Sequence, residues 1–282
     1  MEESIRKSDI LIEALPYLQA FRGKVIVAKY GGSAVDNPAA MRGILQDLVF
    51  LSAVGIRPVL VHGGGPAITQ RLSLAGKRSE FIEGMRVTDG AAMRIVDHAL
   101  REVNQRLVAQ IESLGGHAEG LVASDRIVIA ARHPQASRLG FVGVVKAIQT
   151  RPIRRVFLRH AIPVVSPVGQ SGRQLYNVNA DSVASHVAAR LKAEKLVLLT
   201  NVQGILRQSQ DTASLISTLS GQEAKRLVQR RVIQGGMIPK VTACIDALQH
   251  GVKKTHIIDA GIPHAMLLEI FTKQGIGTEI VH

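Results

Sequence analysis

The sequence predicts an α/β fold built on a mainly parallel sheet. Short apolar runs rich in β-branched residues alternate with longer segments of helical periodicity, which is typical of βαβ units. Two of these runs end in clusters of glycine, at residues 31–32 and 63–65. With 282 residues, of which 46% are hydrophobic and 20% charged, the chain is long enough for one two-lobed domain or two modest ones.

The expected elements follow one another along the chain. Strands are predicted at residues 24–28, 58–61, 126–130, 162–165, 196–200 and 255–258, and helices at residues 38–54, 67–75, 91–114, 182–191, 222–231 and 239–249. Asn37 before Pro38, and Asp89, have side chains suited to cap a first helical turn, and Asp181 is expected to cap the helix at 182–191. Residues 123–147 carry short apolar runs without a long helix, which predicts a small β insertion.

Residues 1–20 are predicted to form a helical segment ahead of the main domain at 21–282. Ile5, Ile12 and Leu15 are among the apolar residues that recur there at partly helical spacing, which Pro16 interrupts. A short chain end with so much apolar surface packs either on its own protomer or on a neighbouring one. The residues alone leave both arrangements open.

The composition favours a soluble cytoplasmic protein and excludes several kinds of site. Cys244 is the single cysteine, so internal disulfides and multi-cysteine metal sites are excluded. No apolar run reaches the roughly 18 residues that span a bilayer. The N-terminus lacks the apolar core and cleavage site of a secretory signal. We therefore expect a cytoplasmic location and no membrane partner.

The chain is strongly basic, since 35 Lys and Arg against 22 Asp and Glu give a formal charge of +13. The charge is scattered, and only residues 151–160 are locally dense in arginine. Aromatic residues make up 3% of the chain, which leaves little material for stacking on bases. We therefore expect no nucleic-acid partner and favour an anionic small substrate.

Two glycine turns follow the first two predicted strands, KYGG at 29–32 and HGGGP at 62–66. Both lead into helices at the carboxyl ends of parallel strands, where backbone N–H groups and helix N-termini form anion sites. A Walker A spacing is absent, and Ile68 stands where a dinucleotide fingerprint from Gly63 needs glycine or alanine. Two such turns, one of them carrying Lys29, favour a phosphate group as the ligand.

Three further stretches have polar residues or glycine at the ends of predicted strands or the starts of helices. NVNAD at 177–181 precedes a helix, and a helix cap alone does not explain both of its asparagines. GGMIPK at 235–240 is a third glycine turn, with Lys240 one turn into the following helix. LLTNVQGIL at 198–206 is a strand that leaves into a loop containing glycine. These stretches belong to the expected ligand edge of the sheet.

Taken in order, KYGG, HGGGP, GMRVT (84–88), NVNAD, LLTNVQGIL and GGMIPK resemble the amino acid kinase family, in the branch that phosphorylates N-acetylglutamate. The resemblance runs from about residue 13 to residue 281. It implies an open αβα sandwich with two lobes, an acetylglutamate-binding lobe at 21–175 and an ATP-binding lobe at 176–282. The implied reaction moves the γ-phosphoryl group of ATP to the side-chain carboxylate of N-acetyl-L-glutamate, early in arginine biosynthesis, with Mg²⁺ carried on the nucleotide.

The resemblance also implies roles for individual residues. Lys29 and Lys240 contact the transferring phosphoryl group from the attacking and the leaving side, and Asp181 lies between them and holds both. The implied substrate-binding residues are Gly64, Gly65, Arg86, Asn177 and Asn179, and the implied ATP-binding residues are Gly31, Gly32, Asn201, Val202, Gly204, Ile205 and Leu206. A carboxylate with a pKa of about 4.3 is already ionised at neutral pH, so the reaction needs neutralised charge rather than a general base.

The two ends of the chain resemble the arginine-sensitive members of the family. EALPYLQAFRGK at 13–24 is similar to their leader, whose N-terminal helix links dimers into a hexameric ring. Residues 256–259 and 269–278 are similar to their arginine site, which implies an effector site at Tyr17, His256, Glu269 and Gly277. The resemblance therefore implies a homo-oligomer, a dimer or a hexamer, and feedback inhibition by arginine.

Several positions depart from the family pattern. Asn201 replaces an aspartate in the nucleotide loop, Val144 replaces a common glutamate, and Lys273 replaces an acidic residue. Residues 101–105, 120–125 and 260–262 also differ, so the departures cluster in the substrate lobe and at the effector end. Two alternatives therefore stay open: a related kinase acting on acetylaminoadipate or a carrier-linked glutamate, and a non-catalytic regulator that binds arginine.

Overall fold

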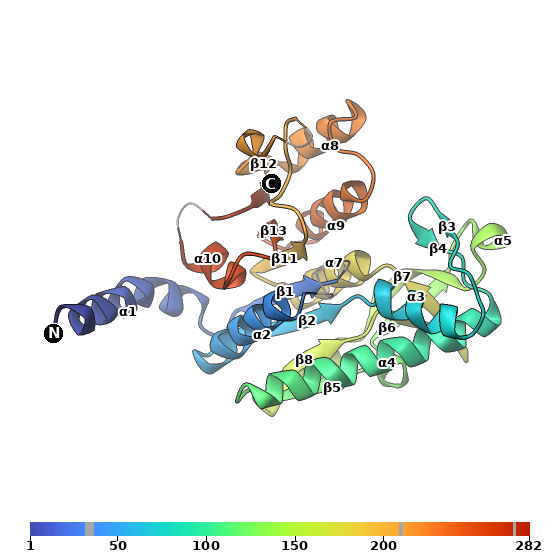
Figure 1. Ribbon diagram of the computed structural model, residues 1–282, viewed down its shortest axis with the longest axis horizontal. Coiled ribbons are helices and arrows are strands. Elements are labelled where there is room, and N and C mark those ends of the chain that lie inside the picture. Colours follow the sequence, from blue (N-terminus) through green and yellow to red (C-terminus); the bar gives the residue numbers. More distant parts are fainter. Residues whose placement is uncertain (32–36, 209–210, 273–274) are drawn as a thin grey trace.

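The computed structural model describes residues 1–31, 37–208, 211–272 and 275–282, and a single mainly parallel sheet lies at its centre (Figure 1). In the described part of the chain the sheet has eight strands in the order β12-β14-β13-β11-β1-β2-β8-β5. Their bounds are β12 Thr218–Ser220, β14 Thr278–Val281, β13 Lys254–Asp259, β11 Lys195–Thr200, β1 Val25–Tyr30, β2 Arg57–His62, β8 Ile162–Val165 and β5 Ala118–Leu121. Only β13 and β14 pair antiparallel among them. The predicted α/β class is confirmed.

Helices cover both faces of this sheet and form two hydrophobic cores. On β1, Ile26 and Ala28 point into one core and Val27 into the other, because successive side chains of a strand alternate between faces. The first core is completed by α2 (Pro38–Ala53), α4 (Gly90–Ser113) and α10 (Ala265–Phe271). The second is completed by α6 (Thr150–Leu158), α7 (Ala180–Leu191), α8 (Gly221–Gln229) and α9 (Met237–Gln249). The molecule is therefore an αβα sandwich, as expected.

The predicted β insertion is part of a small closed barrel. The barrel contains β6 (Val128–Arg132), β7 (Val142–Ile148), β9 (Val168–Ser171) and β10 (Gln174–Val178), with the short helix α5 (Ala136–Leu139) between β6 and β7. The sequence indicated only the segment at 123–147, because β9 and β10 are too short to show a period. The predicted lobe boundary between residues 175 and 176 falls inside β10.

Local geometry corrects two predicted element starts. Arg126 was expected to open a strand, but its φ is +52° at the end of the turn η2 (Ala123–Asp125), so β6 begins at Val128. Asp181 was expected to cap α7, but the cap is Asn179, whose Oδ1 accepts hydrogen bonds from the N–H groups of Asp181 and Ser182. The predicted caps Asn37 and Asp89 are confirmed.

The N-terminal segment is a single helix, α1 (Glu2–Phe21), which projects away from the sheet (Figure 1). Pro16 lies inside this helix and costs it one hydrogen bond without ending it. Near the helix end, the ring of Tyr17 packs edge-to-face on Phe271 of α10, with centroids 6.2 Å apart. Ile12 is 68% exposed and Leu15 is 43% exposed, so these apolar side chains have little packing within the described chain.

The remaining elements connect these layers. α3 (Gly65–Leu74) follows β2, and the hairpin of β3 (Phe81–Ile82) and β4 (Met85–Arg86) follows α3. A 3-10 turn, η3 (Thr212–Ser214), lies between β11 and β12. No helix in the described residues is long and apolar enough to cross a membrane.

Candidate functional site

The two glycine turns lie against each other at the carboxyl ends of β1 and β2. These strands are parallel neighbours, and the N–H of Gly63 donates to the carbonyl of Tyr30 across 2.7 Å. A Cβ on Gly31 would lie 3.0 Å from the Cα of Gly63 and 3.1 Å from the ammonium nitrogen of Lys29. A side chain at position 31 would therefore push the turns and the lysine apart. Gly32 lies outside the described residues.

Asp181 joins two lysines that come from distant parts of the chain. Its Oδ1 lies 2.9 Å from Nζ of Lys29, at the end of β1, and its Oδ2 accepts a hydrogen bond of 3.0 Å from Nζ of Lys240, in the first turn of α9. The Lys29 contact is an ion pair without good hydrogen-bond alignment. Lys29 and Asp181 are buried, whereas Lys240 is a fifth exposed. The structure therefore places Asp181 between the two lysines.

The pKa values in this cluster are shifted by burial and by mutual attraction. Burial disfavours the charged carboxylate of Asp181, but the attraction of Lys29 and Lys240 outweighs it and lowers the pKa of Asp181. Burial also lowers the pKa of Lys29, against the attraction of Asp181. Two lysine side chains therefore share one carboxylate in this cluster. This excess positive charge suits an anionic ligand.

A cavity of about 210 Å³ opens beside the second glycine turn. Its lining includes Gly63, Gly64, Gly65, Arg86, Asn177 and Asn179, together with apolar residues such as Ile68, Leu100 and Val178. A Cβ on Gly64 would lie 2.5 Å from Cδ2 of Leu100, so the turn packs directly on α4. The structure thus brings the predicted substrate-binding residues together around one cavity.

Arg86 is held in place by neighbours that use only part of its hydrogen-bonding capacity. Its Nη2 donates to the carbonyl of Gly65 across 3.1 Å and to Thr69 across 2.8 Å, and its Nη1 donates to Ser79. Its guanidinium also lies over the ring of Phe81, 4.7 Å from the centroid. Burial lowers the pKa of Arg86 below that of a free arginine. A guanidinium has five N–H donors, and these contacts within the described residues use three of them.

The two asparagines of the cavity differ in what they already bind. Nδ2 of Asn177 is 3.3 Å from the hydroxyl of Thr88, a long contact that a ligand could replace. Oδ1 of Asn179 is committed to capping α7, so only its amide N–H groups can serve a ligand. Asn179 thus orients both itself and the first turn that carries Asp181.

The predicted nucleotide loop follows β11 and has a mixed environment. Asn201 and Val202 are exposed, whereas Gly204 and Ile205 are buried. The N–H of Ile205 donates to Thr278 and its carbonyl accepts from the N–H of Ile216, so neither is free. Leu206 forms an isolated bridge with Leu215. Ile205 and Leu206 therefore anchor the loop, and its exposed part is at Asn201 and Val202.

The predicted effector residues meet at a second cavity, of about 260 Å³, between α1 and the sheet edge. Nδ1 of His256 lies 2.6 Å from Oε1 of Glu269, and Tyr17 and Gly277 line the same cavity. Nζ of Lys195 donates to Nε2 of His256 across 3.2 Å, and sequence reasoning missed this lysine because it begins an ordinary buried strand. Burial disfavours the charged Glu269, but His256 and other contacts lower the pKa of Glu269 below its ordinary value.

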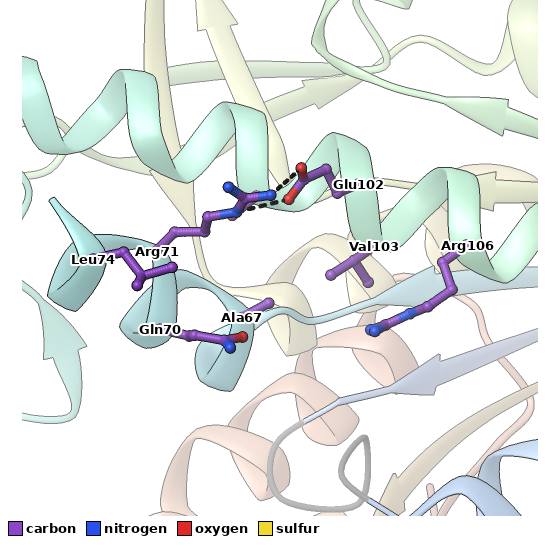
Figure 2. A pocket seen from close by; sticks show the side chains of 8 residues that line it. Ala67, Gln70, Arg71, Leu74, Glu102, Val103 and Arg106 are labelled. Atoms are coloured by element: carbon purple, nitrogen blue, oxygen red, sulfur yellow. Dashed lines mark hydrogen bonds and ion pairs between the residues drawn. The ribbon is translucent and has the colours of Figure 1, made fainter.

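A third cavity, of about 360 Å³, was not anticipated from the sequence. Figure 2 shows it between α3 and α4, where Arg71 and Glu102 form a two-armed ion pair beside Gln70 and Arg106. Its lining also includes the apolar residues Leu74 and Val103, and the lysine cluster does not line it. Groups of three or more metal-ligating side chains are absent from the part of the chain that the structure describes.

Comparison with known proteins gives matches along nearly the whole chain. Residues 24–259 match the model of the amino acid kinase family. The acetylglutamate kinase of Desulforamulus reducens is 47% identical, and the alignment covers 100% of this chain and 99% of that protein. The acetylglutamate kinase of Moorella thermoacetica is 48% identical, with 98% of each chain covered.

Solved structures show the same fold. The N-acetylglutamate synthase of Neisseria gonorrhoeae, complexed with coenzyme A and N-acetylglutamate, is similar with a TM-score of 0.85 at 27% identity, over 96% of this chain and 62% of that one. The same synthase complexed with coenzyme A and L-arginine gives a TM-score of 0.80 at 26% identity, over 95% and 64%. Carbamate kinase from Giardia lamblia shares the fold alone, with a TM-score of 0.65 at 15% identity over 92% and 98%.

Proposed function

The chain belongs to the amino acid kinase family, and from this premise we propose that it transfers the γ-phosphoryl group of ATP to the side-chain carboxylate of N-acetyl-L-glutamate, in arginine biosynthesis. The full-length relatives named acetylglutamate kinase support this reaction and do not favour the alternative acceptors or the non-catalytic regulator. The observation that carries the proposal is the bridge from Lys29 through Asp181 to Lys240, beside two glycine turns. In this proposal Lys29 and Lys240 supply positive charge on both sides of the phosphoryl group that is transferred.

The chemistry requires two anions to meet. The acceptor carboxylate is ionised at neutral pH and attacks phosphorus directly, so no residue has to remove a proton. Lys29 stabilises the charge on the attacking side and Lys240 that on the leaving ADP oxygen. Asp181 keeps both ammonium groups at fixed positions, and the N–H groups of Gly31, Gly64 and Gly65 are neutral donors to the phosphoryl oxygens. The products are an acyl phosphate and ADP.

Mg²⁺ is carried by the phosphates of ATP in this proposal. The donor set of the cluster fits phosphate oxygens rather than a metal ion, since Lys29, Lys240 and backbone amides cannot ligate a cation and Asp181 is occupied by both lysines. When bound, the ion neutralises part of the phosphate charge.

Arg86 is suited to hold the carboxylate of the substrate that does not react. Arg86 and Asn177 line the same cavity, and a planar guanidinium binds a carboxylate through two parallel hydrogen bonds. The exposed residues Asn201 and Val202 of the nucleotide loop are the proposed contacts to ATP. Ile205 acts in the proposal only by anchoring this loop.

We further propose that arginine binds the cavity at Tyr17, His256, Glu269 and Gly277. Glu269 offers a buried carboxylate to a guanidinium, and Lys195 and Lys254 offer positive charge to the carboxylate of the ligand. The similarity to a synthase solved with L-arginine supports this assignment.

The exposed apolar residues of α1 support the proposal of a homo-oligomer, a dimer that α1 extends to a hexamer. The proposed reaction suits a cytoplasmic location.

The proposed function is tested by trapping the acyl phosphate with hydroxylamine in the presence of ATP and Mg²⁺. N-acetyl-L-glutamate, acetylaminoadipate and a carrier-linked glutamate are compared as acceptors, and N-acetyl-L-glutamate should give the highest kcat/KM. Lys240→Ala should lower kcat on the order of 10²-fold because it removes a donor to the leaving oxygen. Lys146→Ala, an exposed lysine on the barrel, is the matched control and should leave kcat unchanged.

Two results would contradict the proposal. A clear preference for acetylaminoadipate would reassign the substrate while keeping the phosphoryl transfer. Turnover that Lys29→Ala and Lys240→Ala both leave intact would show that the cluster does not act on the phosphoryl group.

A further inference from the structure

His62, the last residue of β2, is fixed in one tautomer by its contacts. Its Nδ1 lies 2.8 Å from the carbonyl oxygen of Gly63. Because a carbonyl only accepts, Nδ1 carries the hydrogen. Its Nε2 lies 3.1 Å from Nδ2 of Asn104, an N–H donor, so Nε2 is the acceptor. The side chain is buried, and burial lowers the pKa of His62 to about 4, so the ring is neutral at neutral pH.

Asn104, on α4, is equally constrained. Its Nδ2 also donates to the carbonyl of Val164 on β8 across 2.8 Å, so both amide hydrogens are used. Its Oδ1 occupies the space that a Cβ on Gly120 of β5 would fill. The side-chain amide of Asn104 therefore contacts β8 at Val164, β5 at Gly120, and His62. This chain of contacts runs from β8 through α4 to the glycine turn.

The contacts determine which way the turn presents its amide groups. The N–H of Gly63 is used by Tyr30, and the carbonyl of Gly63 is used by His62. In a planar trans peptide the next N–H points opposite to the carbonyl, so fixing the oxygen of Gly63 also fixes the N–H of Gly64. That N–H has no acceptor among the residues that the structure describes, and Gly64 lines the substrate cavity.

The same face of α4 supports the turn at a second point. Leu100 lies one helical turn before Asn104 and contacts Gly64 so closely that a Cβ there would lie 2.5 Å from its Cδ2. Leu100 thus fixes the distance between the glycine turn and α4. Asn104 acts through His62 and fixes the rotation of the Gly63–Gly64 peptide. Without such support the Gly63–Gly64 peptide could turn over, because glycine has few steric limits.

We propose that His62 and Asn104 are a positioning pair, which holds the Gly63–Gly64 peptide so that the N–H of Gly64 faces the phosphoryl group during transfer. The proposal rests on the proposed function. His62 exchanges no proton in the reaction and touches no substrate; it acts through the peptide. The N–H of Gly64 would then be in place before the substrates bind. A hydrogen-bond donor that needs no reorganisation stabilises the charge of the transition state most.

Two substitutions of His62 separate this role from simple packing. In His62→Asn the amide nitrogen lies close to the position of Nδ1 and can still donate to Gly63, whereas in His62→Gln it reaches the position of Nε2 instead. Both remove the ring and should lower stability alike. We expect His62→Gln to lower kcat on the order of 10²-fold with KM for both substrates within a few-fold, because the N–H is misplaced only for the transition state. His62→Asn keeps the hydrogen bond to Gly63 but loses the one to Asn104, so its kcat should fall by less, within about ten-fold of the wild type.

The control for histidine replacement is His250→Gln, an exposed residue at the far end of α9. It should leave kcat and both KM values unchanged. Equal losses of kcat in His62→Asn and His62→Gln, or full activity in His62→Gln, would overturn the positioning role alone. Absence of turnover in the wild type would overturn the proposed function, and the positioning role with it.

A measurement on the wild-type protein keeps the proposal testable if a variant fails to fold. In ¹⁵N-histidine-labelled protein, the ring nitrogens of His62, assigned by comparison with His62→Asn or by through-bond correlation, should report a hydrogen on Nδ1 at neutral pH. The same tautomer should persist when ADP, aluminium fluoride and N-acetyl-L-glutamate are bound together. A hydrogen on Nε2 in either state would remove the bond to Gly63 and overturn the proposal.

Discussion

Asp181 is the residue whose loss the site should tolerate least. Replacing it with asparagine leaves Lys29 buried with no carboxylate partner, and breaking a buried charge cluster in this way costs about 3 kcal/mol. We expect Asp181→Asn to lower the free energy of unfolding by this amount in urea titrations at pH 7. Glu102→Gln is the control: its pair with Arg71 is exposed to solvent and should contribute less than about 1 kcal/mol. Equal effects of the two changes would contradict this assignment.

His62 makes a prediction about acid stability. Its pKa is about 4 in the folded protein and 6.5 as a free residue. Between these pH values the unfolded chain binds a proton that the folded protein does not, so stability falls as the pH falls from 6.5 to 4, by a total of about 3 kcal/mol. Urea unfolding of wild type and His62→Asn at pH 7, 5.5 and 4.5 tests this. The stability gap between them should narrow as the pH falls, and a constant gap would contradict the shift.

At the scale of residues, the sequence indicated the lysine cluster but not how it is supported. Lys29 and Lys240 could be found because each stands beside a glycine turn. The capping role of Asn179 could not, since several residues of NVNAD can cap a helix and only the backbone angles decide between them. The role of His62 depends on Asn104, which lies 42 positions further along the chain, so no local pattern reveals it.

Among the elements, α2 and α7 offer two asparagine caps that can be compared directly. Asn37 caps α2 and Asn179 caps α7, each accepting hydrogen bonds from two backbone N–H groups. We expect each alanine substitution to cost about 1 kcal/mol of unfolding free energy. Only Asn179→Ala should also lower kcat/KM, because its helix carries Asp181 in the first turn. Unfolding titrations with parallel kinetics test this, and a kcat/KM loss in Asn37→Ala would contradict it.

The helix α1 makes a prediction about regulation. Among its described side chains, Tyr17 and Phe21 line the effector cavity, and none belongs to the lysine cluster or lines the substrate cavity. Removing residues 1–20 should therefore abolish inhibition by arginine, reduce the oligomer size in light scattering and retain kcat. Inhibition that survives the truncation would place the arginine site elsewhere. Loss of kcat would show that α1 supports the active site.

The elements themselves were predictable where they are long and periodic. The helix at 91–114 was expected within one residue of α4, because its apolar face and its cap at Asp89 agree. α6 and α10 were missed, being short, and so were β9 and β10, whose pairing comes from closing the barrel. Pro16 suggested a break in α1, but the helix continues, since one lost hydrogen bond does not end it.

At the scale of the whole molecule, the charge of +13 predicts a salt-dependent affinity for ATP. Lys29, Lys240 and Arg86 add to a long-range positive field that attracts anions and that salt screens. Raising NaCl from about 50 mM to about 300 mM should raise KM for ATP several-fold and leave kcat nearly unchanged, because the buried contacts of the lysine cluster are screened little. Sodium acetate at equal ionic strength is the control for chloride binding. A KM for ATP that does not change with salt would contradict this prediction and would leave solubility as the role of the positive charge.

The class of layered α/β architecture was predictable from the sequence, but the order of the strands in the sheet was not. Parallel strands follow from the alternation of apolar runs and helices, but nothing in the runs says that β1 lies between β2 and β11. The resemblance to a family implied two lobes with a boundary at 175/176. The structure has one sheet shared by both parts, with β10 crossing that point.

The place of β1 in the sheet has a consequence for how the protein is made. β1 pairs on one side with residues 57–62 and on the other with residues 195–200. A ribosome that has released only β1 and β2 has therefore exposed a largely apolar strand with one unpaired edge. That edge of β1 stays unpaired until more than a hundred further residues have emerged and β11 is complete. At about 5–20 residues per second this takes many seconds. The nascent chain should thus need a chaperone most while β11 is still being synthesised.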